Sequence, residues 1–455
     1  MKKHKRSTFS GKLGFVLSAA GASVGLGNIW RFPYLAAKYG GGIFLLVYII
    51  LALTFGYTLI MAETSLGRMT RKSPVGAFES FGNSRFISIG GWINAIIPIL
   101  IVPYYSVIGG WVIKYLIEYF AGHSKTLAGD AYFTTFISNG WSTEICFIIF
   151  TLFTLGIIYA GVRNGIERVS KFMMPILIVL SLIIAVYSVT RLGAIEGVKY
   201  FLVPNFDHFS WMTVVSAMGQ MFYSLSIAMG ILITFGSYMK KDTSIEKSTE
   251  NVEIFDTAIA IMAGLMIIPA VFAFSGGNAE TLKSGPALMF ITIPKVFANM
   301  GFGTAIGVVF FLLVLFAAVT SSIALTESAV STFEDELHWS RKKSTVFMGM
   351  VMLLLGTLSC LGYGPLANFK ILGMQFLDFF DFITNSVMMP IAAIATCLLV
   401  SKVVGVDKIE EEITKDGQAF RRKKIFCFMI KYLCPLFAAI ILISSVANAF
   451  GIITM

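Results

Sequence analysis

Apolar segments long enough to cross a membrane recur along the whole chain and leave few alternatives for its fold. A membrane-spanning helix needs about 20 apolar residues, and we identify such segments throughout the 455 residues. Hydrophobic residues make up 56% of the chain and charged residues 13%, whereas a typical soluble domain contains about 25% charged residues. We therefore predict an all-α polytopic membrane protein. Its eleven candidate spans are residues 13–37, 42–67, 89–121, 143–160, 168–189, 211–237, 254–275, 303–333, 345–361, 376–401 and 427–450.

The middle of the first span is poorly suited to a regular helix. Residues 21–33 read Gly-Ala-Ser-Val-Gly-Leu-Gly-Asn-Ile-Trp-Arg-Phe-Pro. Each glycine costs about 1 kcal/mol relative to alanine in a helix, and unwound backbone at this depth is tolerated only where it is buried in protein or lines a cavity. Gly21 and Gly25 could also serve close helix packing, but packing does not explain the Asn-Arg-Pro tail. We interpret the stretch as a broken helix whose free carbonyls and amides bind a ligand.

The sixth span carries a similar interruption, with Ser224, Ser226 and Gly230 near its middle. Two interrupted spans, each the first in a group of five, are typical of inverted-repeat transporters that bind their substrate between the broken helices. The prediction is a single transporter domain over residues 1–455, with repeat one at about 10–190, repeat two at about 210–402 and a peripheral eleventh helix at about 427–450.

Three further segments lie outside the spans. Residues 194–201 and 287–299 are expected to be re-entrant or surface helices in outer loops. The run at 406–424 has charges of both signs. We expect it to be a solvated inner loop with no catalytic content.

Basic residues are concentrated in alternate loops, which predicts the orientation in the membrane. The opposite loops hold only scattered ones, such as Lys125, Arg191, Lys283 and Lys370. The positive-inside rule places the N-terminus in the cytoplasm and, after eleven spans, the C-terminus outside the plasma (inner) membrane. This topology accounts for the net charge of +10, so no nucleic-acid partner is predicted. The basic clusters fall at residues 2–12, 68–85, 163–171, 240–247, 341–343 and 421–424.

Several classes of protein are disfavoured by what the sequence lacks. The first apolar run continues through the glycine motif, so we expect no cleavable signal peptide. The five cysteines lie in or beside predicted spans and the four histidines are far apart, so neither a disulfide nor a histidine metal site is predicted. No combination of nucleophile, base and acid is evident, and we do not expect an enzyme.

Polar side chains in the seventh and eighth spans need a physical reason. In span eight, Ala317, Thr320, Ser321 and Ala324 fall on one helical face. They could serve helix packing or supply part of the oxygen shell that a sodium ion requires. In span seven, Asp256 either lies at the water boundary or faces a cavity or partner, as intramembrane carboxylates usually do.

Two more charged residues lie within spans. Arg31 follows the glycine stretch, and its expected partner is in span ten, where Asp378, Asp381 and Asn385 share a face. Glu63 in span two is a second buried acid. We expect it to accept hydrogen bonds from backbone amides that the broken helices leave free.

Together these residues resemble the neurotransmitter:sodium symporter family, and in particular its bacterial amino-acid transporters of the LeuT type. The motif Gly-Leu-Gly-Asn-x-x-Arg-Phe-Pro at residues 25–33 carries the resemblance, with support from Ser224-Leu-Ser226 and Thr320-Ser321-Ser322. The resemblance implies a LeuT-like 5+5 inverted repeat with broken helices 1 and 6 and eleven transmembrane helices. It also implies sodium-coupled symport of a hydrophobic or aromatic L-amino acid into the cell by alternating access.

Site residues follow from the same resemblance. The implied substrate site comprises Ala22, Ser23, Leu26, Gly27, Ile101, Tyr105, Tyr223, Ser224, Ser226, Ala228, Met229, Ser322 and Leu325. The first sodium ion would be held by Ser23, Asn28, Ser224 and Asp256, and the second by Gly21, Val24, Ala317, Thr320 and Ser321. Arg31 and Asp381, helped by Gln220, would form the outer gate, and Arg6 with Asp335 the inner gate.

Departures from the family pattern refine these expectations. Monoamine transporters of the family have an aspartate where this chain has Gly25, so the substrate is expected to bring its own carboxylate. Chloride-dependent members have Asn and Ser at the positions of Asp256 and Ala260, so no chloride is expected here. The two sodium ions are implied by the resemblance itself. Ala228 stands where a glycine is common, and Phe9 replaces a tryptophan beside the inner gate.

Alternatives to amino-acid symport also remain open. The substrate could be another small zwitterion, such as a betaine or a β-amino acid. The protein could also be a non-transporting amino-acid sensor. The oligomeric state is not indicated by the sequence.

Overall fold

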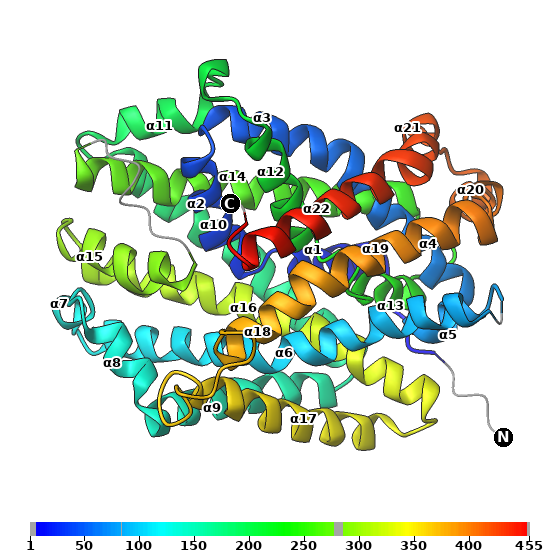
Figure 1. The fold of residues 1–455 in the computed structure, drawn as a ribbon, viewed down its shortest axis with the longest axis horizontal. Helices are drawn as coiled ribbons and strands as arrows, with labels where there is room; N and C mark the ends of the chain where they lie inside the picture. Colours follow the sequence, from blue (N-terminus) through cyan, green and yellow to red (C-terminus); the bar gives the residue numbers. More distant parts are fainter. Residues whose placement is uncertain (1–5, 83, 277–284, 453–455) are drawn as a thin grey trace.

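The computed structural model describes residues 6–82, 84–276 and 285–452, and these residues form a bundle of helices (Figure 1). Within these ranges the β-type pairings are two isolated bridges, Gly41 with Pro204 and Ile371 with Met374. Lys283 and residues 2–5, which contributed to the predicted orientation, lie outside the described ranges.

Nine helices in the described ranges are long and apolar enough to cross a membrane. A bent pair of shorter helices raises this number to ten. The uninterrupted helices are α3–α4 (Gly42–Thr70), α6 (Arg85–Phe120), α9 (Gly140–Tyr159), the helix ending in α10 (Val162–Val189), α14 (Ile245–Ser275), α16 (Gly303–Glu336), α17 (Arg341–Leu361), the helix containing α18 and α19 (Phe376–Val404) and the helix containing α21 and α22 (Lys423–Ala449).

The first predicted span is broken, as the glycine-rich sequence indicated. Helix α1 (Lys12–Ser23) ends where Val24 N–H donates to the Ala20 carbonyl at 2.7 Å. A π-helical turn, Gly27–Arg31, then leads into α2 (Phe32–Lys38), and the two halves are bent by 53°. Pro33, the second residue of α2, has no N–H to donate to the preceding turn, which is this π-helical segment.

The sixth predicted span is broken as well. Helix α12 (Trp211–Ser224) and helix α13 (Ile231–Tyr238) are separated by residues without helical structure. In this gap Ser226, Ala228 and Gly230 have φ angles of 51°, 59° and 68°. Left-handed backbone interrupts the helical hydrogen-bond ladder. A membrane-spanning helix needs about 20 residues, so neither half could cross the bilayer alone. The sixth predicted span therefore corresponds to this interrupted pair.

The segments expected outside the spans are helical. Helix α11 (Ala194–Leu202) and helix α15 (Ile293–Ala298) occupy the two outer segments. The charged run at 406–424 contains α20 (Val406–Ile413) and the start of α21 (Lys423–Phe428). This run is not a freely solvated loop, because several of its side chains are buried against the bundle, as described below.

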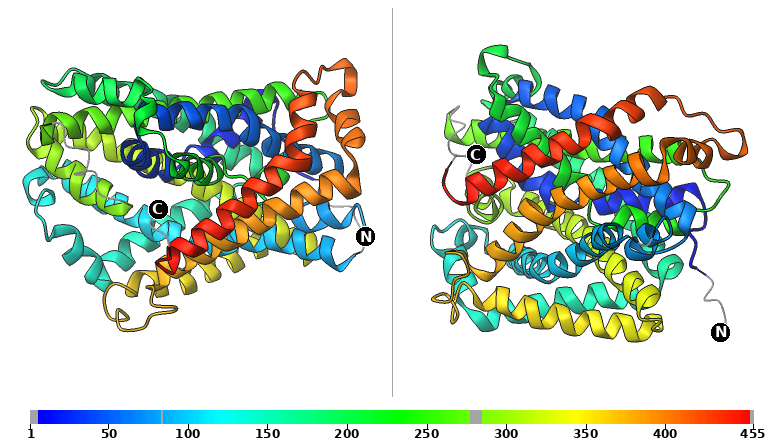
Figure 2. Two further views of the ribbon diagram at one scale, coloured as in Figure 1. Left: turned by 45° about the horizontal axis from the view of Figure 1, so that its top comes forward. Right: turned by 45° about the vertical axis from the view of Figure 1, so that its right-hand side comes forward.

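The broken helices occupy the centre of the molecule. Helix α1 packs against α14, α16 and α10 (Arg168–Val189), and α13 packs against α4 (Tyr57–Thr70). Helix α22 (Cys434–Ala449) runs obliquely across the outside of the bundle beside α19 (Met389–Leu398) (Figure 2). The two breaks thus face each other, surrounded by continuous helices.

Candidate functional site

A small cavity of about 30 Å³ lies between the two helix breaks. This is close to the volume that one water molecule occupies in the liquid, so a larger solute needs the surrounding side chains to move. The first break contributes Ala22, Ser23, Gly25, Leu26, Gly27 and Asn28 to its lining. The second break contributes Tyr223, Ser226 and Met229, helix α6 contributes Ile101 and Tyr105, and helix α16 contributes Ser321 and Leu325.

Three residues that the sequence assigned to the substrate site do not line this cavity, namely Ser224, Ala228 and Ser322. Ser322 points toward α9, where its hydroxyl lies 3.3 Å from that of Thr154. Its neighbour Ser321 lines the cavity instead. Ala228 donates its backbone N–H to Glu63 Oε1 at 2.7 Å. Ser224 bonds to the carboxylate of Asp256 at 2.9 and 3.0 Å.

Glycines at the first break allow polar groups and one ring to approach the backbone closely. A Cβ on Gly25 would lie 2.7 Å from Ser321 Oγ and 3.2 Å from the Tyr105 hydroxyl oxygen. A Cβ on Gly27 would lie 2.3 Å from the ring of Tyr223. The Leu26 N–H donates to the Tyr105 hydroxyl at 3.4 Å. A backbone amide, two hydroxyls and an aromatic ring therefore meet in the lining of the cavity.

A fully buried carboxylate lies beside the cavity. Asp256 has 0% of its surface exposed and accepts hydrogen bonds from Asn28 Nδ2 at 2.8 Å and from Ser224 Oγ at 2.9 Å. The Tyr48 hydroxyl donates to it at 3.0 Å. Its burial excludes the alternative that this residue lies at the water boundary. Tyr48 was missed in the sequence, since a lone tyrosine in an apolar run carries no signal of such a contact.

A second group of oxygens gathers between the first break and α16. Ser321 Oγ lies within hydrogen-bonding distance of three backbone carbonyls that α1 no longer uses for its own ladder. These are the carbonyls of Ala22 at 3.1 Å, Gly21 at 3.3 Å and Val24 at 3.5 Å. Thr320 Oγ1 lies 3.2 Å from the Ala317 carbonyl. Carbonyls and hydroxyls, with a carboxylate at Asp256, are the donors that a hard cation such as sodium takes.

The outer gate predicted from the sequence is not closed by an ion pair. Asp381 Oδ1 accepts hydrogen bonds from Tyr104 at 3.2 Å and Asn385 at 2.6 Å. The Arg31 guanidinium instead lies 5.3 Å from the centre of the Tyr223 ring. Both charged residues line a cavity of about 480 Å³ above the helix breaks. Gln220, the third member, donates to the Gly27 carbonyl at 3.1 Å.

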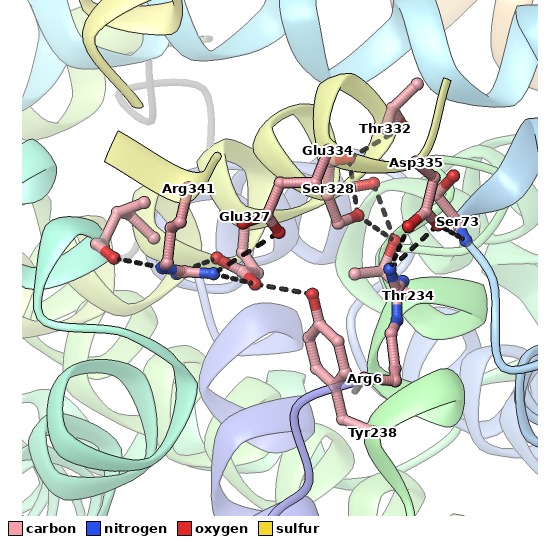
Figure 3. A network of polar contacts seen from close by, with 12 residues as sticks. Arg6, Ser73, Thr234, Tyr238, Glu327, Ser328, Thr332, Glu334, Asp335 and Arg341 are labelled. Atoms are coloured by element: carbon pink, nitrogen blue, oxygen red, sulfur yellow. Dashed lines mark hydrogen bonds and ion pairs between the residues drawn. The ribbon is translucent and has the colours of Figure 1, made fainter. Parts of the chain in front are cut away.

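The opposite end of the molecule is closed by paired charges (Figure 3). Arg6 Nη1 lies 2.7 and 2.8 Å from the two oxygens of Asp335, and its other nitrogens donate to Ser237 Oγ at 2.9 and 3.0 Å. The Ser73 N–H donates to Asp335 at 2.6 Å. Burial alone would lower the pKa of Arg6, but Tyr238, Asp335 and neighbouring acids raise it above its ordinary value. The guanidinium therefore stays charged and paired.

A second charge pair adjoins this closure. Glu327, which is fully buried, accepts from Arg341 Nη2 at 2.5 Å and from the Tyr238 hydroxyl at 2.6 Å. Figure 3 shows both side chains converging on its carboxylate. Arg341 Nε also donates to the Ile158 carbonyl at 2.9 Å. This pair could not be predicted from the sequence, since the acid lies inside an apolar span and the arginine belongs to a basic cluster at the start of α17.

Interrupted helices that face each other in a membrane bundle, with oxygen clusters at the interruptions, are typical of transporters that bind solute and coupling ion between broken helices. The comparison with known families agrees. The family model described as Sodium:neurotransmitter symporter family matches residues 6–147 and 137–452, and the chain belongs to this family.

Relatives span the full chain. A sodium-dependent transporter of Bacillus subtilis (strain 168), YhdH, itself uncharacterized, is 33% identical over 457 residues and covers 100% of both chains. The sodium- and chloride-dependent GABA transporter ine of Drosophila melanogaster is 26% identical over 96% of this chain and 51% of its own length. The crystal structure of MhsT in complex with L-phenylalanine superposes with a TM-score of 0.87 and 34% identity, over 97% of this chain and 100% of that chain. The chain is thus a sodium-dependent transporter with the LeuT fold, as the motif at 25–33 predicted.

Proposed function

We propose that the protein couples sodium entry to the uptake of an L-α-amino acid with a hydrophobic or aromatic side chain, independently of chloride. The observation that carries this proposal is that the cavity lining combines polar groups with apolar side chains. Leu26 N–H and the Tyr105 hydroxyl meet in the lining and form what we call its polar end, whereas Ile101, Met229 and Leu325 supply apolar surface.

The polar end suits a zwitterion. An amide N–H and a hydroxyl can donate to a carboxylate. Backbone carbonyls at the first break suit an ammonium group, and one of them, that of Ala22, accepts from Ser226 Oγ at 2.9 Å in this structure. The lining contains no charged side chain, and the space at Gly25 is limited by Ser321 and Tyr105. A substrate that carries both charges is therefore favoured over a simple amine. The phenylalanine in the MhsT complex supports an aromatic or aliphatic side chain.

Two sodium ions are proposed at the two oxygen clusters. The first would be held by Ser23, Asn28, Ser224 and Asp256, and the second by Gly21, Val24, Ala317, Thr320 and Ser321. The Asp256 carboxylate supplies a fixed negative charge beside the first ion. The Drosophila relative is named as chloride-dependent, and we propose that this carboxylate makes chloride unnecessary here.

The paired and unpaired gates favour an outward-facing starting point for alternating access. Sodium and amino acid enter through the side lined by Arg31 and Asp381, Tyr223 closes over the substrate, and spans one, two, six and seven rock as a bundle. Repeats at about 10–190 and 210–402 provide the symmetry for this motion. With the N-terminus in the cytoplasm and the C-terminus outside the plasma membrane, the motion ends by separating Arg6 from Asp335. One sodium charge moved through ~100 mV supplies about 2.3 kcal/mol.

Uptake into proteoliposomes tests the proposal. Labelled L-phenylalanine is supplied with an inward sodium gradient, with choline replacing sodium as the control, and amino acids, their amines, betaines and β-amino acids are tested as competitors. We expect sodium-dependent uptake that α-amino acids inhibit and amines do not. Exchange of labelled for unlabelled substrate distinguishes a carrier from a sensor. Equal uptake in choline refutes sodium coupling.

Two hydroxyl deletions on the same helix provide a matched pair for the second sodium site. Thr320→Ala removes a proposed ligand, whereas Ser322→Ala removes a hydroxyl that bonds to Thr154 on α9. We expect the sodium concentration for half-maximal uptake to rise at least fivefold in Thr320→Ala and to change less than twofold in Ser322→Ala. Equal shifts in the two variants contradict the assignment.

A further inference from the structure

The segment that joins α19 to α22, residues 406–424, is fastened to the transporter core. We call this segment the strap. It contains α20 and the start of α21, and it lies beside α4 at one end of the bundle (Figure 1). From its contacts we infer that the strap moves with the second and seventh spans during transport, and that Arg68 and Glu246 are positioning residues for this motion. The inference rests on the alternating-access function proposed above.

The first fastening is a buried arginine at the end of the second span. Arg68, near the end of α4, has 2% of its surface exposed. Its Nε lies 2.6 Å from Glu412 Oε1 in α20, and a second nitrogen bonds to the Glu412 carbonyl. Nη1 donates to the Thr243 carbonyl, just before α14, at 2.6 Å. One guanidinium therefore ties the second span, the start of the seventh and the strap together.

The second fastening is a carboxylate at the start of the seventh span. Glu246, in the first turn of α14, is 3% exposed. It accepts the backbone N–H groups of Arg421 at 2.9 Å and Arg422 at 3.2 Å, and the Tyr57 hydroxyl at 2.9 Å. Because Tyr57 begins α4, the same two spans are engaged again.

The Arg422 side chain extends this fastening. Its Nη1 lies 3.2 Å from Glu253 Oε2 in α14, and its guanidinium lies 4.6 Å from the centre of the Tyr57 ring. Glu253 is buried. Charge-assisted hydrogen bonds between buried groups are the stronger kind, and separating a buried pair leaves uncompensated charges. Both ends of the strap are thus held firmly to spans two and seven.

The connections of the strap to its own flanking helices are, in contrast, irregular. The helix before it ends in a π-helical segment, Leu399–Val404. Gly405 follows with φ of 86°, and a Cβ there would meet nothing within 4 Å, so the glycine is required by its backbone conformation and not by space. A second π-helical segment, Met429–Leu433, follows α21. Such segments interrupt regular hydrogen bonding and often lie at functional positions. They are where a displacement of the strap can be absorbed.

Three spin-label distances test the inference. Lys408 in the strap, Lys247 in α14 and Lys342 in α17 are exposed, and each is replaced by cysteine in pairs on a Cys427→Ser background, since Cys427 is the free cysteine that is not buried. Distances are measured in proteoliposomes with sodium and L-phenylalanine and then without sodium. We expect the 247–342 and 408–342 distances to change and the 408–247 distance to stay constant.

The outcomes separate the two proposals. If 247–342 changes while 408–342 stays constant, the strap belongs to the static part and the inference is wrong, although the proposed transport remains intact. If 247–342 does not change, the bundle does not rock, and both the mechanism and the inference fail.

Variants add a functional measurement. Arg68→Gln is expected to leave sodium-dependent phenylalanine binding within twofold of the parent and to reduce the uptake rate at least fivefold, with partial recovery in Arg68→Lys. Lys423→Gln is the matched control, because it breaks a strap ion pair with Glu410 that is partly exposed, and its uptake rate should stay within twofold. If Arg68→Gln does not fold, Glu412→Gln makes the same test while Arg68 keeps its bond to the Thr243 carbonyl. Parental uptake in the variant that folds overturns the positioning role.

Discussion

Replacing Asp256 by asparagine removes one negative charge at the proposed first sodium site with little change in shape. An ion bound by Asn28 and Ser224, whose polar atoms lie 2.8 and 2.9 Å from the Asp256 carboxylate, sits within about 4 Å of the charge. At an effective dielectric constant of about 20, such a pair is worth about 4 kcal/mol. Since each 1.4 kcal/mol corresponds to about a tenfold change in affinity, the upper limit for the loss is about a thousandfold.

The expected loss is smaller than this limit, because the parent also bears the cost of burying the carboxylate without an ion. We therefore expect Asp256→Asn to raise the sodium concentration for half-maximal phenylalanine binding by at least about tenfold. The measurement is a titration of labelled phenylalanine binding with sodium at constant ionic strength. Sodium dependence equal to that of the parent would refute the reasoning.

A second buried acid provides the control. Glu63 is also fully buried, but its carboxylate accepts the Ala228 N–H and lies outside both oxygen clusters. Glu63→Gln makes the same change, from a buried acid to its amide, at a position away from the proposed ion. We expect its sodium titration to shift less than about threefold, even if the variant is less stable. A tenfold shift in this variant would mean that any buried charge affects sodium binding, and the Asp256 result would then not identify a ligand.

Chloride replacement tests the second consequence of the same carboxylate. With gluconate in place of chloride, uptake by the parent should stay unchanged, and a strong chloride requirement contradicts the role of Asp256 as a fixed anion. In Gly27→Ala the added Cβ would lie 2.3 Å from the Tyr223 ring, so we expect a higher KM for phenylalanine with little change in the sodium titration. An unchanged KM contradicts the proposal that Tyr223 closes over the substrate. Arg6→Gln should expose Ser237→Cys to thiol reagents from the inner side, since the bonds to Asp335 are lost. Ala228→Gly should raise the melting temperature in detergent, because relief of a φ of 59° stabilises by at least about 0.5 kcal/mol.

Both helix breaks could be predicted from the sequence because unwound backbone is so costly in lipid. The glycines at 21–27 and the serines and glycine at 224–230 are better explained by unwound backbone than by helix packing. The structure confirms both interruptions. The breaks are visible in the local composition because the residues that unwind are the same glycines and serines that make a regular helix unfavourable there.

Contacts between distant segments could not be predicted in this way. The strap has a mixed-charge sequence typical of a solvated loop, yet Glu412 pairs with Arg68, which is 344 residues away. Ser322 adjoins Ser321 in the sequence, but successive helical residues point about 100° apart, so only one of them faces the cavity. Arg31 and Asp381 contact other residues and not each other. Whether two such residues pair depends on the conformation of the molecule, which cannot be read from the residue types.

The contrast between the two gates explains how modest binding energies can drive the cycle. In this state Arg6 and Asp335 are joined at 2.7 Å, whereas Arg31 and Asp381 each have other partners. In the proposed cycle, closing the outer gate and opening the inner one would exchange one arginine–aspartate pair for another of the same chemistry, so the two costs would largely offset. A ligand shifts such an equilibrium only by the difference between its affinities for the two states. Sodium ions at the proposed second site would meet this condition, because the positions of the carbonyls there depend on how the halves of the broken helix are oriented.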